Sequence, residues 1–599
     1  MKKINNNILA VLILTVSVLY QVHCAIRGFD LTDEGYLMTI YQWFGTDVYY
    51  AQGAGGYPLT AYLGWLLNGI FPEGGILAMR LWGILLVTMT GVVLYLYLRR
   101  YFHERIALVG LLMQSIFVAQ DPKPFGYNTL TALIACVAVI LLVEGTIRRR
   151  SWMLVGGGML LGVNVFVRIP NITGLAFLII PYLYNCKGLH ELQLLKSTRQ
   201  ALLVVVGFIV AMAGAWAFLV HIGADKLVVD LITSIDDTLG GKSTHGSMSM
   251  INKYLENFFL SIQFFIIFVV GMLVCSMSRL VKNIIGKLII WFIAFQIVYR
   301  MTYLNSNVLG DSVLGMMNGI GIFGACYYLM KGSTMRTLAL TGILFSLVIP
   351  MGSDQGFQTM WVGTWLVLPM GLSGLYTLVL QTEEQQWHTS FWVSNEKTSG
   401  YRILRINVPQ NLRTAFFICL GTFILATVAK VENRAYYDPG HKTEKTYAIH
   451  SHKSKGIYTT ERRAAVINPL LKELDKYVKP GETLLVYDSS PLLYYLTDTK
   501  PFAGISWPCV FYGQQYVDKF KAAEASTQQM PVLVMQQYYS SNNWSHPLKE
   551  YISPKFDASF SSKEMSKNIF RFIKQHHYRV VWTNKYYKIM VPGLEEVSQ

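Results

Sequence analysis

"ILAVLILTVSVLYQVHCAIRGFDLTDEG", residues 8–35, joins a continuous apolar run to a cluster of acidic residues. The run from Ile8 to Ile26 is about 19 residues long, which is the length that a helix needs to cross a bilayer. Lysines precede the run, as in a signal peptide, but no small-x-small cleavage site follows it. We therefore expect an uncleaved transmembrane helix with a cytoplasmic amino terminus, followed by an outer loop that carries Asp33 and Glu34.

The composition is that of an integral membrane protein. Of the 599 residues, 53% are hydrophobic and only 14% are charged, whereas soluble domains carry roughly 25% charged residues. The net charge of +16 does not indicate a nucleic-acid partner, because most basic residues flank apolar segments, where they orient a membrane protein. Of the 7 cysteines, only Cys509 lies in the polar C-terminal part, which therefore has no internal disulfide and no cysteine metal cluster.

About thirteen apolar segments have the length of a membrane span, so we predict an α-helical polytopic membrane protein. The predicted cores are Ile8–Ile26, Ile76–Leu98, Ile106–Ala119, Thr129–Ile147, Trp152–Val167, Ile172–Tyr184, Ala201–His221, Tyr254–Ser276, Leu288–Tyr303, Ser312–Met330, Thr337–Met351, Met360–Leu380 and Ala415–Lys430.

The charges of the connecting loops predict the orientation. The loops after even-numbered spans are basic, such as RRYFHER, RRR, KGLHELQLLKSTR, SRLVKNIIGK and KGSTMR. The opposite loops contain acids and few basic residues, such as DLTDEG, AQDPKPFGYN, DLITSIDDTLGG and NSNVLGD. Cytoplasmic loops carry an excess of lysine and arginine. The basic loops are therefore expected in the cytoplasm, and an odd number of spans puts the C-terminal region outside.

The chain divides into two expected domains. Residues 1–430 form a transmembrane domain, whose first outer loop, 27–75, is rich in aromatic residues and predicts short helices at the bilayer surface. Residues 431–599 are long enough for a separate extracytoplasmic α/β accessory domain. There, GETLLVYDSS, MPVLVMQQ and RVVWTNKYYKIMV predict strands, and PLLYYLTD predicts a short helix.

The adjacent acids Asp33 and Glu34 have two interpretations. A loop that leaves a membrane needs polar residues, and acids serve this purpose on the outer side. Alternatively, one carboxylate is a general base at the lipid surface, which would contribute roughly 10²–10⁴-fold to a reaction. The second acid would then raise the pKa of the first by repulsion, or the two would bind a divalent cation.

Several basic residues lie near the outer ends of spans, against the prevailing charge rule: Arg80, Lys123, Arg168, Lys242 and Arg300. Each side chain can reach water without any chemical role. As a set, they indicate an anionic ligand such as a phosphate-headed lipid. Arg168 is the most informative, because the following Pro170 takes the chain out of the helix and fixes the arginine on stiff backbone. The remaining loop residues Asp236, Asp237, His245, Asp311 and Asp354 are interpreted as solvated or helix-end residues.

The order of these motifs resembles the GT-C membrane glycosyltransferases. The resemblance rests on "DEG" after the first span, "YPLTAYLGWLLNG" in the outer loop and "AMRLWGILLVTMTGVVLYLYLRRYF" in the second span. It covers roughly residues 8–184 by motif, and the tail by architecture alone. The most similar families are the bacterial aminoarabinose transferases, the protein O-mannosyltransferases and the bacterial sugar transferases of lipopolysaccharide cores.

The resemblance implies roles for individual residues. Asp33 would be the catalytic base, with Glu34 as its acidic neighbour and Asp121 as a second acid. Family members place that second acid nearer the fourth span, where this chain has Asn128. A basic residue after the fifth span, here Arg168, would bind the donor phosphate. Lys123, Arg300 and Arg80 would assist Arg168.

The resulting hypothesis is a glycosyltransferase in the bacterial cytoplasmic (inner) membrane. It would move a sugar from a polyprenyl phosphate to a hydroxyl of a glycan, lipid or protein on the outer face, by an inverting displacement. Whether a divalent cation at Asp33 and Glu34 is a cofactor stays open. The alternatives are a transporter or flippase of lipid-linked sugars, an O-antigen polymerase or ligase, and an inactive protein whose tail is a binding module.

Overall fold

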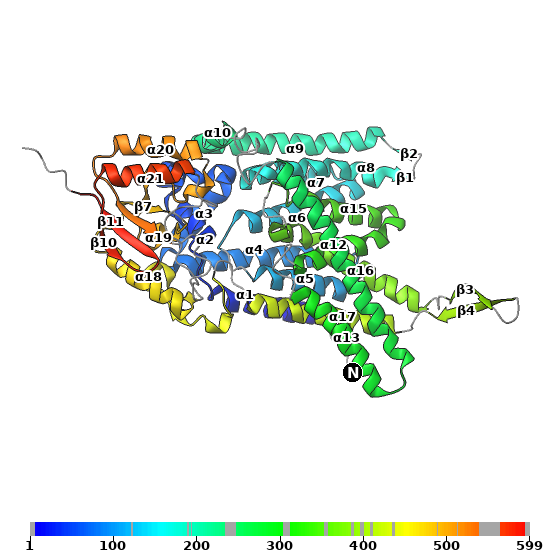
Figure 1. The fold of residues 1–599 in the computed structure, drawn as a ribbon. Helices are drawn as coiled ribbons and strands as arrows, with labels where there is room; N and C mark the ends of the chain where they lie inside the picture. The colour runs from blue at the N-terminus through cyan, green and yellow to red at the C-terminus, as the bar shows by residue number, and fades with distance from the viewer. Residues whose placement is uncertain are drawn as a thin grey trace, which may run out of the picture.

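The computed structural model describes residues 6–120, 124–187, 191–192, 194–233, 247–303, 312–352, 357–384, 388–395, 400–407, 411–433, 438–487, 489–511, 513–537 and 563–593. Most of these residues are helical. An elongated helical bundle carries the C-terminal sheet at one end and the hairpin β3–β4 (His388–Asn395 and Gly400–Asn407) at the other (Figure 1). We call these the sheet end and the hairpin end.

The prediction of a polytopic helical protein is confirmed, since each predicted span coincides with a helical segment. Within the described residues, nine segments are long and apolar enough to cross a bilayer, and the segments α5, α7, α15 and η3–α8 are shorter. The bundle consists of α1 (Asn6–Ala25), α4 (Gly75–Leu98), α5 (Glu104–Val118), α6 (Tyr127–Arg148), α7 (Ser151–Val167), η3 (Ile169–Ile179), α8 (Ile180–Asn185), α9 (Leu194–His221), α12 (Ser247–Ser276), α13 (Ile284–Tyr303), α14 (Ser312–Ala325), α15 (Ser333–Val348), α16 (Phe357–Glu384) and α17 (Leu412–Glu432).

The two ends of α1 lie at opposite ends of the bundle. Near its start, Asn6 donates to Glu104 and accepts from Arg105, the first two residues of α5. After its last turn, the backbone of Gly28 donates to the carbonyl of Tyr458 in the C-terminal region over 2.8 Å. The first span therefore connects the hairpin end to the sheet end.

The first loop folds into short helices, as its sequence predicts. They are α2 (Asp33–Trp43), the 3₁₀ segment η1 (Val48–Gly56) and α3 (Pro58–Ile70). The carboxylate of Asp30 accepts hydrogen bonds from the backbone N–H groups of Thr32 and Glu34, at 2.8 and 3.0 Å. Asp30 thereby satisfies amide groups that the start of α2 would leave unpaired.

The C-terminal region contains a five-stranded sheet with the order β10-β11-β9-β7-β8. Strand β7 runs parallel to β8 and β9, whereas β11 is antiparallel to both β9 and β10. The strands are β7 (Thr483–Tyr487), β8 (Lys500–Pro501), β9 (Val532–Gln536), β10 (Arg579–Thr583) and β11 (Tyr587–Val591), and the main helices are α18 (Glu461–Leu474), α19 (Leu492–Leu496), α20 (Gly513–Ser526) and α21 (Lys563–Gln575). The predicted strands and the predicted short helix are all present.

This region shares a hydrophobic core with the first loop. Phe29, Met38 and Tyr41 are fully buried in one cluster with Leu492 and Ile467 of the C-terminal region. The approach of α2 to α19 is so close that a Cβ added to Gly35 would lie 2.2 Å from the backbone nitrogen of Leu492. The position of α2 therefore depends on residues more than 400 positions away.

A buried carboxylate reinforces this contact. Asp438 is fully buried and accepts hydrogen bonds from the backbone of Phe29 at 3.0 Å and from the hydroxyl of Thr459 at 2.7 Å. The side chains of Arg463 and Lys445 approach the same carboxylate to 3.3 and 3.9 Å. These charges are paired with one another, so their burial is tolerated.

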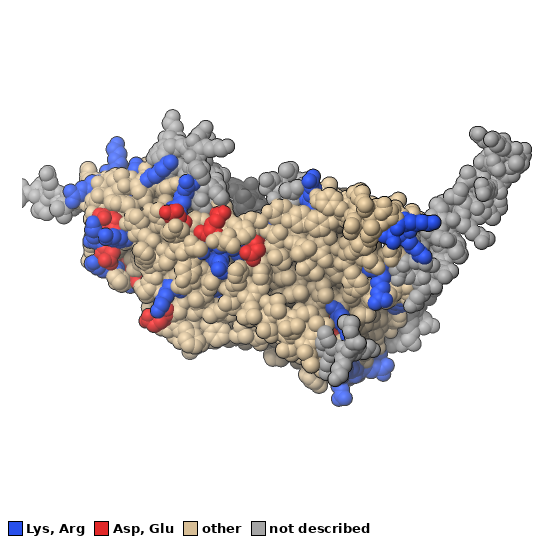
Figure 2. Space-filling view, turned by 90° about the horizontal axis from the view of Figure 1, so that it is seen from below, with Lys and Arg blue, Asp and Glu red and all other residues tan. Residues whose placement is uncertain are grey.

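The charge distribution on the surface matches a membrane protein. On the face drawn in Figure 2, most of the acidic side chains lie over the sheet end. Lysine and arginine side chains lie at both the sheet end and the hairpin end. A broad band without charged side chains separates the two ends. Such a band is expected where a protein faces lipid hydrocarbon.

Candidate active site

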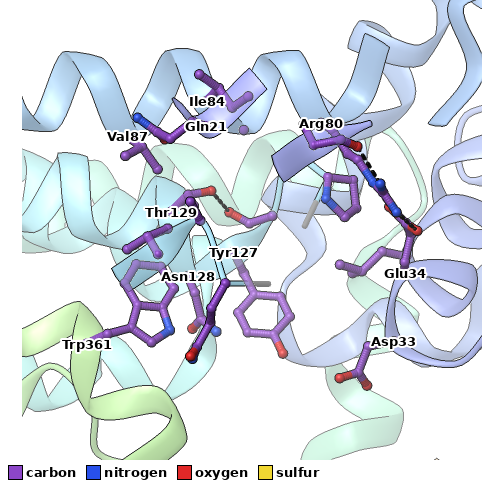
Figure 3. Close-up of a pocket in the computed structure, with 18 of the residues that line it drawn as sticks. Gln21, Asp33, Glu34, Arg80, Ile84, Val87, Tyr127, Asn128, Thr129 and Trp361 are labelled. Atoms are coloured by element: carbon purple, nitrogen blue, oxygen red, sulfur yellow. Dashed lines mark hydrogen bonds and ion pairs between the residues drawn. The ribbon is translucent and has the colours of Figure 1, made fainter. Parts of the chain in front are cut away.

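A cavity lies inside the bundle near the sheet end, where α1, α2, α4, α16 and the connection from α5 to α6 meet (Figure 3). The space in it that the centre of a water molecule can reach is about 100 Å³, and part of the cavity is open to the surroundings. Its walls are largely apolar and aromatic, with a few polar groups, as is typical of small-molecule sites. The polar lining residues are Gln21, Asp33, Glu34, Tyr36, Arg80, Gln120, Tyr127, Asn128 and Thr129.

Glu34 and Arg80 form a buried ion pair at one wall. The Nε and Nη2 atoms of Arg80 each donate to one carboxylate oxygen of Glu34 over 2.6 Å. Both side chains are at most 2% exposed. The guanidinium also donates to the carbonyls of Ala25 and Gly28, at 2.5 and 2.9 Å. The geometry ties α4 to the end of α1 and the start of α2.

Asp33 has a different environment, although it is the neighbour of Glu34. Its side chain is half-buried, lines the cavity and has no hydrogen bond or ion pair with any described residue. In Figure 3 it points away from the Glu34–Arg80 pair. A carboxylate without a partner is available to accept a proton from a bound molecule.

Asp30 lies close to these two acids, and its carboxylate accepts a hydrogen bond from the backbone of Glu34. Burial raises the pKa of Asp30 to about 7, and the nearby carboxylate of Asp33 adds to the rise. Its hydrogen bonds from Thr32 and Glu34 oppose the rise only in part. The cavity is therefore next to a group that titrates close to neutral pH.

The residues directly before α6 also line the cavity, and hydrogen bonds tie them to neighbouring helices. The backbone of Phe125 donates to the carbonyl of Met79 over 2.7 Å, and its own carbonyl accepts from the hydroxyl of Tyr41 over 2.9 Å. The hydroxyl of Thr129 donates to the carbonyl of Gly126, which precedes α6. Tyr127 and Asn128 are thus presented on backbone that is tied to α2 and α4.

Arg168 does not itself line the cavity. It ends α7 in extended backbone, with φ −158° and ψ 115°, directly before η3. Its side chain is 6% exposed, and its Nη1 donates to the carbonyl of Ile349 over 3.2 Å. It interacts electrostatically with Tyr127, which lines the cavity, and with Tyr254. No described carboxylate forms an ion pair with Arg168.

The structure thus brings together only part of the predicted site. Asp33, Glu34 and Arg80 line one cavity, whereas Arg168 is not among its lining residues and Arg300 is exposed on α13. Glu34 and Arg80, predicted to have separate roles, bind each other. The other predicted residues, Asp121, Lys123, Lys242, Asp236, Asp237, His245, Asp311 and Asp354, lie outside the described residues.

A metal ion has few ligands here. Within the described residues, no three or more histidine, cysteine, aspartate or glutamate side chains converge on one point. Of the two acids suggested for a cation, Glu34 is occupied by Arg80. The cation therefore stays an untested prediction.

Three residues that line the cavity were not predicted from the sequence to have a role. Gln21 interrupts the apolar run of α1, and Gln120 directly follows the last turn of α5. Trp361 comes from α16. A polar residue within an apolar span is costly and signals a function, so Gln21 could have been identified, whereas Trp361 carries no such signal.

The fold and this cavity define a polytopic membrane protein with a carboxylate facing a cavity near one end of its bundle. The sequence family that matches is described as dolichyl-phosphate-mannose-protein mannosyltransferase, and the match covers residues 55–216. This match, which covers about a quarter of the chain, supports a membrane glycosyltransferase of the GT-C type. The matched residues include Arg80, Asn128 and Arg168 but begin after Asp33 and Glu34. Among the curated proteins, none matches this sequence.

Proposed function

We propose that this glycosyltransferase moves a sugar from a polyprenyl phosphate to an acceptor hydroxyl in the cavity, with inversion at the anomeric carbon. The acceptor oxygen forms a bond to that carbon, while the bond from the carbon to the phosphate oxygen breaks. The electron pair of the broken bond leaves on the polyprenyl phosphate. The proton of the acceptor hydroxyl goes to the carboxylate of Asp33, which acts as general base.

The observation that carries this proposal is the contrast between two adjacent acids. The charge of Glu34 is neutralised by Arg80 over two contacts of 2.6 Å, whereas Asp33 faces the cavity without a partner among the described residues. A base must keep its lone pairs free until the substrate arrives. Asp33 meets this requirement and Glu34 does not, so we assign Glu34 a positioning role.

The environment of Arg168 supports a phosphate site beside the cavity. A guanidinium that is 6% exposed and lacks a carboxylate partner in the described chain is costly unless an anion binds it. In addition, α6 begins at the cavity after Gly126, which provides no side-chain cap for its first N–H groups. Helix amino termini favour anions. The donor phosphate would lie between Arg168 and this helix start, where Lys123 and Arg300 remain predicted helpers.

The proposed orientation puts the sheet end outside the cytoplasm of a bacterium. The basic connections Arg99–Arg105 and Arg148–Arg150 belong to the opposite end of α4 and α6. Basic loops favour the cytoplasmic side. Residues 431–599 would then be an extracytoplasmic domain that positions α2, and the lipid-linked sugar would be reached from the outer leaflet, together with a glycan, lipid or protein acceptor.

The test is sugar transfer by the protein reconstituted in liposomes. Polyprenyl phosphates that carry mannose, glucose, galactose or aminoarabinose would be offered with envelope glycolipids as acceptors, and released polyprenyl phosphate would be measured. We expect acceptor-dependent release with at least one donor, inverted anomeric configuration in the product, and a loss of roughly 10²–10⁴-fold in Asp33→Asn. Undiminished transfer by Asp33→Asn would rule out Asp33 as the base.

A further inference from the structure

Two amide side chains face the cavity from the ends of the connection between α5 and α6. Gln120 follows α5 and is 6% exposed, and Asn128 is the second residue of α6. Both line the cavity that the Glu34–Arg80 pair also lines. Neither residue has a role in the mechanism proposed above.

Both amides have an oxygen atom without a hydrogen bond. Oε1 of Gln120 and Oδ1 of Asn128 are buried and have no hydrogen-bond partner among the described residues. Buried acceptors are normally satisfied, because an unpaired one is costly. Two of them at one cavity indicate that the missing donors belong to a bound molecule.

The chemistry of the missing partner narrows its identity. An amide oxygen accepts hydrogen bonds, so the ligand must offer N–H or O–H groups to these two side chains. A polyprenyl chain has no such groups, and the oxygens of an ionised phosphate are acceptors only. The hydroxyl groups of a sugar ring are donors. Of the three parts of a lipid-linked sugar, only the sugar can satisfy Gln120 and Asn128.

The surroundings suit a sugar ring that is attached to a phosphate. Tyr127 lies between the two amides in sequence, lines the cavity and interacts with Arg168, the proposed phosphate ligand. Tyr127 and Tyr57 pack with ring centroids 4.9 Å apart, and Trp361 adds a further aromatic side chain to the lining. Few polar groups on an aromatic lining are typical of sites that orient a small ligand.

The segment directly before α6, which presents Asn128, is anchored to neighbouring helices. Its backbone is bonded to Met79 of α4 and to Tyr41 of α2 through Phe125. A site that is held in place and built to bind hydroxyl groups rejects ligands that lack them, because its polar groups then stay unpaired.

We propose that Gln120 and Asn128 bind hydroxyl groups of the sugar on the lipid-linked donor and thereby select the sugar. This inference rests on the proposed glycosyl transfer, but it concerns binding and does not require the chemical step. In this proposal they bind the sugar and take no part in the bond changes, so they are specificity-determining residues rather than catalytic ones.

The experiment measures equilibrium binding to the full-length protein in detergent. The ligands are undecaprenyl phosphate alone and undecaprenyl phosphates carrying mannose, glucose, galactose or aminoarabinose. We expect at least one sugar to raise the affinity of the wild type above that for undecaprenyl phosphate. Gln120→Leu and Asn128→Ala should each reduce that gain about 5- to 10-fold, the loss of one ordinary hydrogen bond. Gln120→Glu retains an acceptor oxygen and should keep part of the gain.

Bare undecaprenyl phosphate is the internal control, because its affinity should not change in these variants. The inference is overturned if no sugar improves binding to the wild type, if both variants keep the full gain, or if folded variants lose affinity for the bare phosphate equally. The proposed function fails separately: Asp33→Asn should retain the sugar-dependent gain while it loses transfer. If a sugar raises the binding affinity as expected but the protein transfers no sugar, the binding site is supported and the proposed transfer is not.

Discussion

Asp33 and Glu34 occupy adjacent positions of α2, yet one carboxylate faces a cavity and the other is enclosed with Arg80. A helix turns by about 100° per residue, so neighbouring side chains necessarily point in different directions. Asp33 and Glu34 therefore have two separate roles. Glu34 fixes the start of α2 against α4, and Asp33 is held at the cavity by the helix that Glu34 fixes.

The first prediction separates the structural role of the ion pair from catalysis. Glu34→Gln and Arg80→Met should each lower the free energy of unfolding by about 3–5 kcal/mol, because each leaves a buried charge alone. The double variant should lose less than the sum of the two. It should not recover fully, since the carbonyls of Ala25 and Gly28 lose their donor. Unfolding by denaturant in detergent measures this cycle, and strictly additive losses would contradict a direct pairing.

The second prediction concerns Arg168. Arg168→Met should lower the affinity for polyprenyl phosphate by roughly 10- to 100-fold, the effect of losing a hydrogen bond to a charged group. The same change should raise the melting temperature of the protein without donor, because a buried guanidinium with no carboxylate partner among the described residues is removed.

Arg100→Met is the matched control, since Arg100 is exposed at the hairpin end. It should change neither the donor affinity nor the melting temperature. Unaltered donor binding in Arg168→Met would remove Arg168 from the phosphate site.

Much of the fold could be predicted because its signals are local. An apolar run of bilayer length, such as Tyr127–Arg148, is visible without knowledge of its neighbours, and so is the short apolar run that predicts β9. The pairing of Glu34 with Arg80 is different. It joins residues 46 positions apart. Glu34 had been predicted as the acidic neighbour of the catalytic base and Arg80 as a ligand of the donor phosphate. Nothing in either local sequence indicates that the two charges neutralise each other.

The contact between the C-terminal region and the first loop likewise could not be predicted from local sequence patterns. The sequence predicted a separate domain from length and composition. The hydrogen bond from Phe29 to Asp438 spans 409 positions, and Gly35 fits against Leu492 only because it has no side chain. Asp33 could be proposed from its place after the first span, whereas Gln120 could not, because its significance lies in a missing partner.

The third prediction tests that contact with a pair of glycines. Gly35→Ala should destabilise the protein by about 1–3 kcal/mol and reduce transfer, because the added methyl group would overlap the backbone of Leu492 and displace α2 with Asp33. Gly421→Ala in α17 is the control, since a Cβ there meets no atom within 4 Å. It should leave activity unchanged and stabilise the helix by about 0.5–1 kcal/mol. Equal effects of both changes on melting temperature and transfer would contradict the close approach.

The last prediction follows from the raised pKa of Asp30. Its pKa is about 7 in the folded protein, against an ordinary value of 3.8, so between these values the folded state binds a proton that the unfolded state has released. Stability from this group is therefore complete below pH 3.8 and is lost as the pH rises toward 7.

Asp30→Asn has no proton to lose, and this part of the pH dependence should vanish. The difference in melting temperature between Asp30→Asn and the wild type should accordingly grow in favour of the variant as the pH rises through this window, and should stay constant above pH 7. The comparison cancels the other titrating groups, which both proteins share. Melting curves in detergent at several pH values measure it, and parallel curves for the two proteins would show that burial does not raise the pKa of Asp30.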